Sequence, residues 1–83
     1  MEKEVGKVVH YFDKIGVGIV ELTDKLKVGD KVHIVGGKTD FEQTVSSMQE
    51  EKEVLEEAGK GKSVGIKVDQ EVRENDKVFV VTE

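Results

Sequence analysis

Through most of this chain apolar residues recur at every second position, and short polar or glycine-containing turns interrupt them. The clearest stretch is VGIKV at residues 64–68, where Val64, Ile66 and Val68 share one face. A period of two is the period of a β-strand with one buried face. Because no segment carries a convincing apolar stripe at helical spacing, the chain is predicted to be all-β.

The predicted strands are short and separated by turn signals. Gly16 and Gly18 lie inside the second of them, where glycine usually marks a bulge or a close backbone approach. Val45 and Met48 have opposite parity, so a bulge is expected between them. Six or more short strands predict a small closed antiparallel β-barrel of the translation-protein type, since closure removes exposed strand edges. The strands are expected at residues 5–12, 15–22, 31–35, 41–48, 64–68 and 77–82.

Two predicted turns have nearly the same sequence. The stretch LKVGDKVHIV at residues 26–35 aligns with VRENDKVFVV, so that Gly29 matches Asn75 and Asp30 matches Asp76. Glycine and asparagine adopt the left-handed conformation most easily. Both turns are therefore predicted to have a positive φ at the same place, just before a strand.

In residues 49–58, QEEKEVLEEA, a helix competes with extended structure. Helix propensity is high, and Gly59 could cap the end of a helix. The only apolar pair is Val54 and Leu55, so a helix here would have no apolar stripe to bury. The segment is predicted to be strand and loop, with its glutamates in solvent rather than in a cation or partner site.

Composition limits the class of protein. A length of 83 residues predicts one domain over residues 1–83. The absence of cysteine excludes disulfides and zinc–thiolate sites. No apolar stretch approaches the ~20 residues of a membrane-spanning helix, and the N-terminal MEKE is no signal peptide, so the expected location is the cytoplasm.

The net charge of -5 disfavours non-specific nucleic-acid binding. A charged fraction of 37% resembles proteins of hyperthermophiles.

No motif supports catalysis or cofactor binding. The stretch GKGKS at residues 59–63 lacks the first glycine of a P-loop, which would fall at Glu56, and it precedes a strand instead of a helix. The two glycines of the second strand lack the third glycine and the helix of a dinucleotide-binding motif. His10 and His33 could be neighbours, but two imidazoles without a third ligand do not make a stable metal site. No enzyme activity, cofactor or metal is predicted.

The second strand carries a candidate partner contact. Ile15, Val17 and Ile19 form an apolar row on one of its faces, and the other face is apolar as well. Both faces cannot lie inside a barrel wall, so this row is predicted to be partly exposed and to contact a partner domain or a second copy. The alternative is that loops or the termini cover it.

The first turn carries a candidate RNA contact. Lys7, Tyr11 and Lys14 offer basic and aromatic groups of the kind that bind single-stranded RNA. The neighbouring Phe12 is expected to pack in the core.

Four stretches resemble the β-barrel that follows the GTPase domain in translation factors such as elongation factor Tu and initiation factor 2. They are IGVGIV at 15–20, LKVGDKV at 26–32, VSSM at 45–48 and AGKGKSVGI at 58–66. Two longer stretches, GKVVHYFDKIGVGIVEL at 6–22 and TDFEQTVSSMQ at 39–49, more closely resemble the C-terminal barrel of U32 peptidase-family proteins.

The resemblance implies an accessory module, because the sequence contains neither a GTPase domain nor a peptidase domain. Some U32 family members act in RNA modification. The expected function is a non-catalytic binding module associated with translation or RNA-modification machinery, whose partner is a protein or an RNA–protein assembly. The alternative is a protein–protein or self-assembly module, such as a homodimer, with no nucleic-acid role.

Overall fold

The computed structural model describes residues 2–50 and 53–82, and this part of the chain contains ten strands and no helix. The all-β prediction is confirmed. The described residues include no helix that could cross a membrane. The strands are β1 (Glu2–Phe12), β2 (Val17–Leu22), β3 (Leu26–Lys27), β4 (Lys31–Val35), β5 (Asp40–Thr44), β6 (Met48–Glu50), β7 (Glu53–Leu55), β8 (Glu57–Ala58), β9 (Ser63–Lys67) and β10 (Lys77–Val81).

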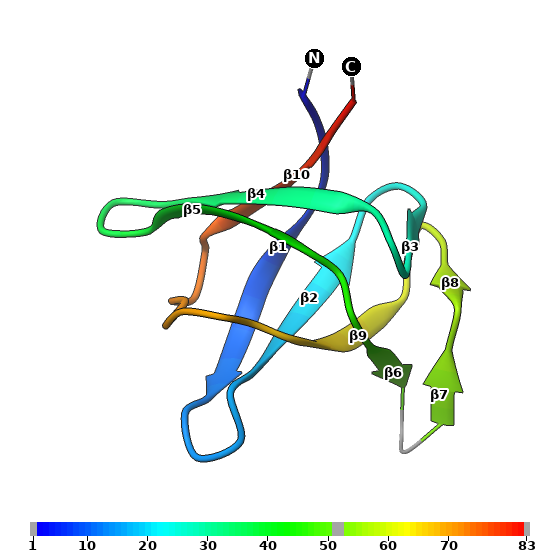
Figure 1. Cartoon of the computed structure of the whole chain (residues 1–83), viewed down its shortest axis with the longest axis horizontal. Coiled ribbons are helices and arrows are strands. Elements are labelled where there is room, and N and C mark those ends of the chain that lie inside the picture. Colours follow the sequence, from blue (N-terminus) through cyan, green and yellow to red (C-terminus); the bar gives the residue numbers. More distant parts are fainter. Residues whose placement is uncertain (1, 51–52, 83) are drawn as a thin grey trace.

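Eight strands form one antiparallel sheet in the order β5-β4-β10-β1-β2-β9-β6-β7, and β3 pairs with β8 in a separate ladder. The two ends of the chain lie side by side, because β1 and β10 are neighbours and Glu2 pairs with Val81 (Figure 1). The turn between β1 and β2 lies at the opposite end of the molecule from the termini.

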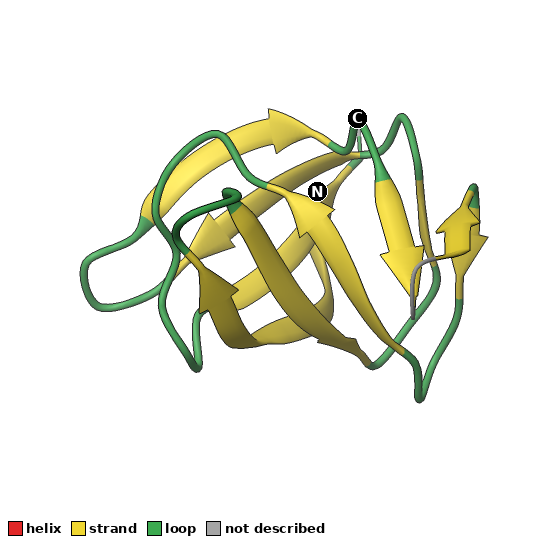
Figure 2. Ribbon diagram, turned by 90° about the horizontal axis from the view of Figure 1, so that it is seen from below, coloured by secondary structure: helices red, strands yellow, loops and turns green. Residues whose placement is uncertain are grey.

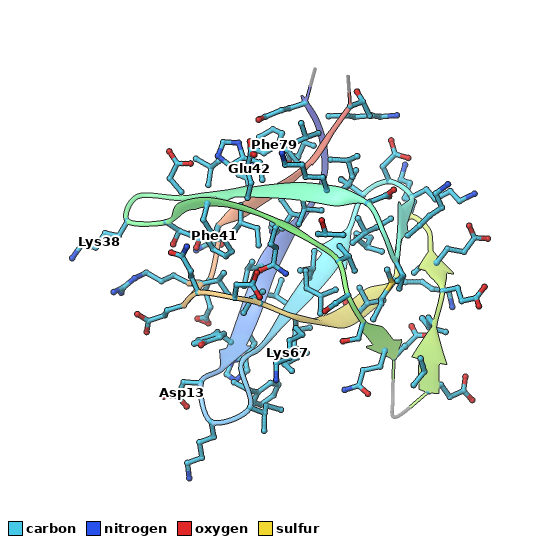
Figure 3. The ribbon with its side chains drawn as sticks, viewed as in Figure 1. Asp13, Lys38, Phe41, Glu42, Lys67 and Phe79 are labelled. Carbon is cyan, nitrogen blue, oxygen red and sulfur yellow. The ribbon has the colours of Figure 1, made fainter. Side chains whose placement is uncertain are left out.

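The large sheet is strongly curled (Figure 2). The buried hydrophobic side chains form a single cluster. Phe41 points toward this interior, whereas Lys38 and Asp13 extend outward from loops (Figure 3). Along the strands, the alternating apolar residues therefore face the core and the polar residues between them face solvent, as expected for strands with one buried face. The largest fully enclosed side chains are Leu22, Leu26, Ile34, Met48 and Ile66.

The predicted closed barrel is not confirmed, because the hydrogen-bonded order of the large sheet has two ends, β5 and β7. A turn at residues 28–30, the bridging turn, lies between them. The N–H of Gly29 donates to the carbonyl of Val45 over 2.9 Å, and the N–H of Val28 donates to the carbonyl of Glu56 over 2.8 Å. Val45 directly follows β5, and Glu56 directly follows β7. The bridging turn therefore connects the two ends of the large sheet. In a closed barrel, the two end strands would pair with each other directly.

The described residues of the 49–58 segment are extended apart from a bend at Glu56. β6, β7 and β8 follow one another through this segment. The prediction of strand and loop is therefore confirmed, and the alternative of a helix is wrong. Residues 51–52 lie outside the described part of the chain. The predicted strand at 41–48 is split, because β5 ends at Thr44 and β6 begins at Met48. Val45 and Met48 are both buried despite their opposite parity, because a break in the strand, and not the predicted bulge, brings both inward.

The two related turns adopt the same structure. Gly29 and Asn75 have φ angles of 96° and 74°, so the predicted positive φ is confirmed in both. In each turn the aspartate side chain accepts a hydrogen bond from the backbone N–H three residues earlier, over 3.0 Å at Asp30 and 2.8 Å at Asp76. This aspartate bond closes the turn on itself.

Each turn is also bonded to a distant part of the chain in the same way. The N–H of the positive-φ residue donates to the carbonyl of Val45 in the first turn and of Val8 in the second, over 2.9 and 2.7 Å. The N–H groups of Val45 and Val8 donate back to the carbonyls of the two aspartates, over 2.9 and 2.8 Å. One turn design is therefore used twice, including its tertiary hydrogen bonds.

A β-bulge in β1 decides which aromatic side chain faces the core. The register of β1 against β2 shifts between Val8 and His10, which inserts one extra residue and inverts the parity of the strand beyond it. Tyr11 consequently packs against the core, and Phe12 is 45% exposed. The prediction that Phe12 packs in the core is wrong for this reason.

The two glycines near the start of β2 have different roles. β2 begins at Val17, so Gly16 lies in the preceding turn, where its φ is 65°, and not inside the strand as predicted. Gly18 lies within β2, and a Cβ there would be 3.1 Å from the Cγ2 of Val72. Close packing therefore explains Gly18, and backbone conformation explains Gly16.

Candidate docking face and polar cluster

One face of the large sheet carries a row of residues that crosses four strands in register. Ile19 of β2 pairs with Gly65 of β9, Gly65 pairs with Gln49 of β6, and Gln49 pairs with Val54 of β7. Residues directly opposite one another in antiparallel strands share a face. Val17 lies two residues before Ile19 and therefore shares that face as well.

Gly65 forms the floor of a hollow in this face. A Cβ at Gly65 would lie 3.1 Å from the Cγ1 of Val17 and 3.4 Å from the Cδ1 of Ile19, so the side chains of β2 lean over the glycine. Two adjoining hollows of about 300 and 280 Å³ meet there. We call this surface the apolar groove; its exposed or half-buried apolar side chains are Phe12, Ile15, Val17, Ile19 and Val54.

The side chains of the apolar groove are open to solvent. Val54 is 81% exposed, Ile15 58% and Phe12 45%, and Val17 and Ile19 are half-buried. Of the four large hydrophobic side chains that are exposed in the described part of the chain, three are therefore in the groove. Such clustering on an otherwise charged surface is typical of an interaction site.

The row predicted from the sequence accounts for only part of the groove. Val17 and Ile19 share the outward face of β2, and Ile15 lies in the turn before it, so all three are partly exposed as expected. Gly65 and Val54 were not predicted, because they reach this face only through the pairing of β6 with β9 and with β7. The role of the row as a partner contact stays a prediction.

The three residues predicted to contact RNA do not form one surface. Tyr11 packs against the core. Lys7 lies between Glu21 of β2 and Lys77 of β10 in the register of the sheet, and Lys14 is exposed in the turn that follows β1. RNA platforms combine exposed aromatic rings with adjacent positive charge. The structure separates these components, and the RNA contact stays a prediction.

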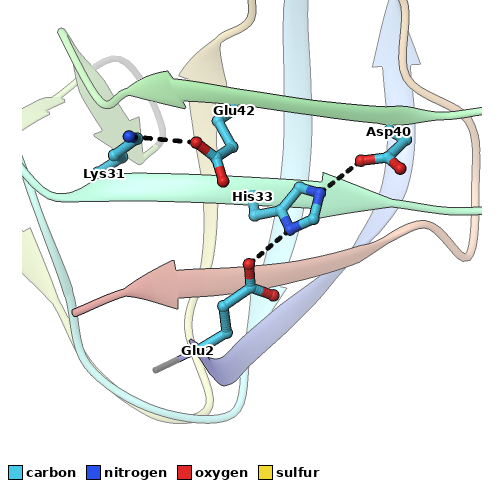
Figure 4. A network of polar contacts seen from close by, with 5 residues as sticks. All are labelled: Glu2, Lys31, His33, Asp40 and Glu42. Carbon is cyan, nitrogen blue, oxygen red and sulfur yellow. Dashed lines mark hydrogen bonds and ion pairs between the residues drawn. The ribbon is translucent and has the colours of Figure 1, made fainter. Parts of the chain in front are cut away.

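A polar cluster lies on the sheet near the termini (Figure 4). It consists of Glu2, Lys31, His33, Asp40 and Glu42. The Nδ1 atom of His33 lies 2.7 Å from Oε2 of Glu2, and its Nε2 lies 2.5 Å from Oδ1 of Asp40. These hydrogen bonds, first to Asp40 and then to Glu2, raise the pKa of His33. The Nζ of Lys31 lies 3.1 Å from Oε1 of Glu42.

His10 does not join the polar cluster. In the register of the sheet His33 pairs with Phe79 and Phe79 with Glu4. His10 lies six positions beyond Glu4 along β1, which corresponds to about 20 Å along a strand. The ring of His10 instead packs edge-on against Phe12, with centroids 4.4 Å apart. The structure thus keeps the two histidines apart.

The lysine-rich stretch at residues 59–63 connects two strands. β8 ends at Ala58 and β9 begins at Ser63, and Gly61 between them has a φ of 89°. The segment is a turn before a strand, as predicted, and it lacks the helix that a P-loop requires.

Comparison with known proteins identifies the family. The model of the peptidase family U32 C-terminal domain matches residues 3–77. An uncharacterized protease of Methanocaldococcus jannaschii is 41% identical over 81 residues, which cover 96% of this chain and 20% of that protein. A collagenase of Porphyromonas gingivalis is 35% identical over 77 residues, which cover 90% of this chain and 21% of that protein. The chain thus spans about a fifth of the length of these curated relatives.

Solved structures show the same fold. The C-terminal domain of a U32 peptidase from Geobacillus thermoleovorans superimposes with a TM-score of 0.90, covering 96% of this chain and 93% of that one at 20% identity. Its selenomethionine variant gives a TM-score of 0.87, covering 92% and 96% at 22% identity. The comparisons confirm the predicted U32 resemblance but not the resemblance to elongation factor Tu. By the match over residues 3–77, this chain belongs to the peptidase family U32 C-terminal domain family.

Proposed function

We propose that this chain is a non-catalytic binding module that contacts a protein partner through the apolar groove. The observation that carries the proposal is the clustering of exposed hydrophobic side chains around Gly65. An accessory role also agrees with the relatives, in which the matching segment is about a fifth of a protein named as a protease or collagenase.

The chemistry of the groove supports binding rather than catalysis. Catalytic sites bring polar groups together and shift their pKa values. Among the described residues, the pKa is lowered at Asp24, through its ion pair with Lys3, and raised at His33. Neither residue lines the groove, whose polar lining residues are Ser47, Gln49, Glu50, Ser63 and Lys67.

The same chemistry favours a protein partner over nucleic acid. An apolar hollow with a glycine floor can accept an apolar side chain of a partner, whereas phosphate backbones require positive charge. The chain has a net charge of -5. The resemblances to the translation-factor barrel and to the U32 family make translation or RNA-modification machinery the setting in which we expect this partner. A cytoplasmic location and a thermophilic source stay predictions from composition.

The experiment compares two substitutions of the same type. Val17→Lys places a charge in the groove, and Val28→Lys places the same charge at the exposed hydrophobic residue outside it. The immobilised chain is used to capture proteins from native lysate with and without nuclease. We expect a protein that is retained after nuclease by the unmodified chain and by Val28→Lys, and lost with Val17→Lys. Equal capture by both variants would contradict the proposal.

Two further readouts separate the alternatives. Loss of all captured protein on nuclease treatment would favour the RNA-contact prediction. Sedimentation of the pure chain tests self-assembly: a dimer that disappears with Val17→Lys alone would make a second copy the partner. Circular dichroism must show that both variants keep the β-sheet spectrum, which we expect because both valines are at least partly exposed.

A further inference from the structure

The polar cluster contains more than a surface ion pair. Glu2, His33 and Glu42 each offer one ligand atom, and these three atoms lie within 4.8 Å of one another. They come from β1, β4 and β5, and His33 pairs with Glu42 in the sheet register. We propose that this cluster binds a divalent transition-metal ion, such as Zn²⁺, through the Nδ1 of His33 and the carboxylates of Glu2 and Glu42.

The orientation of the imidazole distinguishes this site from a group of acidic residues. The Nε2 of His33 is held by the carboxylate of Asp40. Metal-binding histidines almost always donate their second ring N–H to such a group, which fixes the tautomer and leaves the other nitrogen free for the metal. Here the other nitrogen is Nδ1, and it points at Glu2 over 2.7 Å. The side chain of His33 is half-buried, with 20% of its surface exposed.

The distances permit coordination after small side-chain movements. Zinc lies about 2.0–2.2 Å from nitrogen and oxygen ligands, so ligand atoms in a tetrahedral site are about 3.4 Å apart. Nδ1 and Glu2 are already closer than this. The carboxylate of Glu42 must approach by up to about 1.4 Å, the difference between 4.8 Å and that spacing. Its side chain is 43% exposed and can rotate. Water would complete the coordination.

Charge and ligand type define the class of ion. Three carboxylates, of Glu2, Asp40 and Glu42, surround the ring, and the ammonium group of Lys31 is the positive charge beside them. This excess of negative charge favours a cation, and the same negative charge stabilises a proton on His33. Imidazole selects zinc, copper and nickel over the hard ions magnesium and calcium. When the metal binds, Nδ1 releases its proton to solvent and Lys31 gives up its contact with Glu42.

Calorimetric titration of the tag-free chain with zinc chloride tests the site. We expect one zinc ion per chain. His33→Gln should weaken the affinity by at least about tenfold, and Asp40→Asn should weaken it by about 10–100-fold through loss of the ring orientation. His10→Gln is the matched control and should leave the affinity unchanged. Lys31→Gln should tighten binding, because it removes a competing positive charge.

Nuclear magnetic resonance of the unmodified chain gives a readout that needs no substitution. Zinc should shift the ring resonances of His33 and leave those of His10 in place. The proposal is overturned if zinc at millimolar concentration shifts neither ring, if His33→Gln binds as tightly as the unmodified chain, or if magnesium competes equally with zinc.

Discussion

The two related turns share one set of hydrogen bonds but differ in burial. Asp76 is 3% exposed, whereas Asp30 is half-buried. The chain also packs closely around Asp76, since a Cβ at Gly36 would overlap its Oδ1 and lie 2.6 Å from its Cγ. The comparison shows that local sequence specifies the turn in both places, while the surrounding tertiary packing sets how much each turn contributes to stability.

The largest expected effect is at the contact between Gly36 and the second turn. Gly36→Ala should lower the free energy of unfolding by about 2–3 kcal/mol, because the new methyl group overlaps the buried side chain of Asp76, which its hydrogen bond with Arg73 holds in place. Urea unfolding followed by circular dichroism measures the loss. Gly37→Ala is the control: a Cβ there meets nothing within 4 Å, so its effect should lie between zero and a gain of about 1 kcal/mol.

The buried aspartate itself gives the next largest effect. Asp76→Ala should cost about 2 kcal/mol, because the backbone N–H of Arg73 loses its acceptor in a site with little access to water. Asp76→Asn keeps an acceptor oxygen and should cost less than half as much. If both variants lose the same stability in thermal unfolding, the carboxylate charge, and not the acceptor, supports the turn.

The equivalent change in the first turn should be milder. Asp30→Ala should cost about 1 kcal/mol, because water can replace the lost acceptor for the N–H of Lys27. The same urea titration measures it. A loss equal to that of Asp76→Ala would show that burial does not separate the two turns.

Exchanging the positive-φ residues should have the smallest effect. Gly29→Asn and Asn75→Gly should each change stability by less than about 1 kcal/mol, since both residues tolerate this conformation. Asn75→Val is the contrasting variant and should cost about 1–2 kcal/mol, because its Cβ is unfavourable at positive φ. Differential scanning calorimetry of the three variants tests whether the two positions are interchangeable.

The features that depended on local sequence were predicted. The repeated turn was recognised from Gly29 and Asn75, and the inward face of β2 from its alternation. The helix at 49–58 was rejected because it had no apolar stripe. In each case neighbouring residues carry the whole signal.

The features that depended on distant pairing were not predicted. The bulge in β1 inverted the roles of Tyr11 and Phe12, and no local residue marks it. Gly65 joins the apolar groove through β6, and Glu2 of β1 meets His33 of β4 across β10, which lies between these two strands. Such juxtapositions follow from the strand order, which alternation in a single sequence does not specify.

The bridging turn has a consequence for how this protein opens. A strand inside the sheet is held by ladders on both sides, so its local separation breaks many amide bonds together. In the described part of the chain, the bridging turn joins the ends of the sheet through only three backbone bonds: Gly29 N–H to the carbonyl of Val45, Val45 N–H back to the carbonyl of Asp30, and Val28 N–H to the carbonyl of Glu56. Local opening of the sheet should therefore start at the bridging turn. The amide protons of these residues should exchange with solvent before those of β1 or β2.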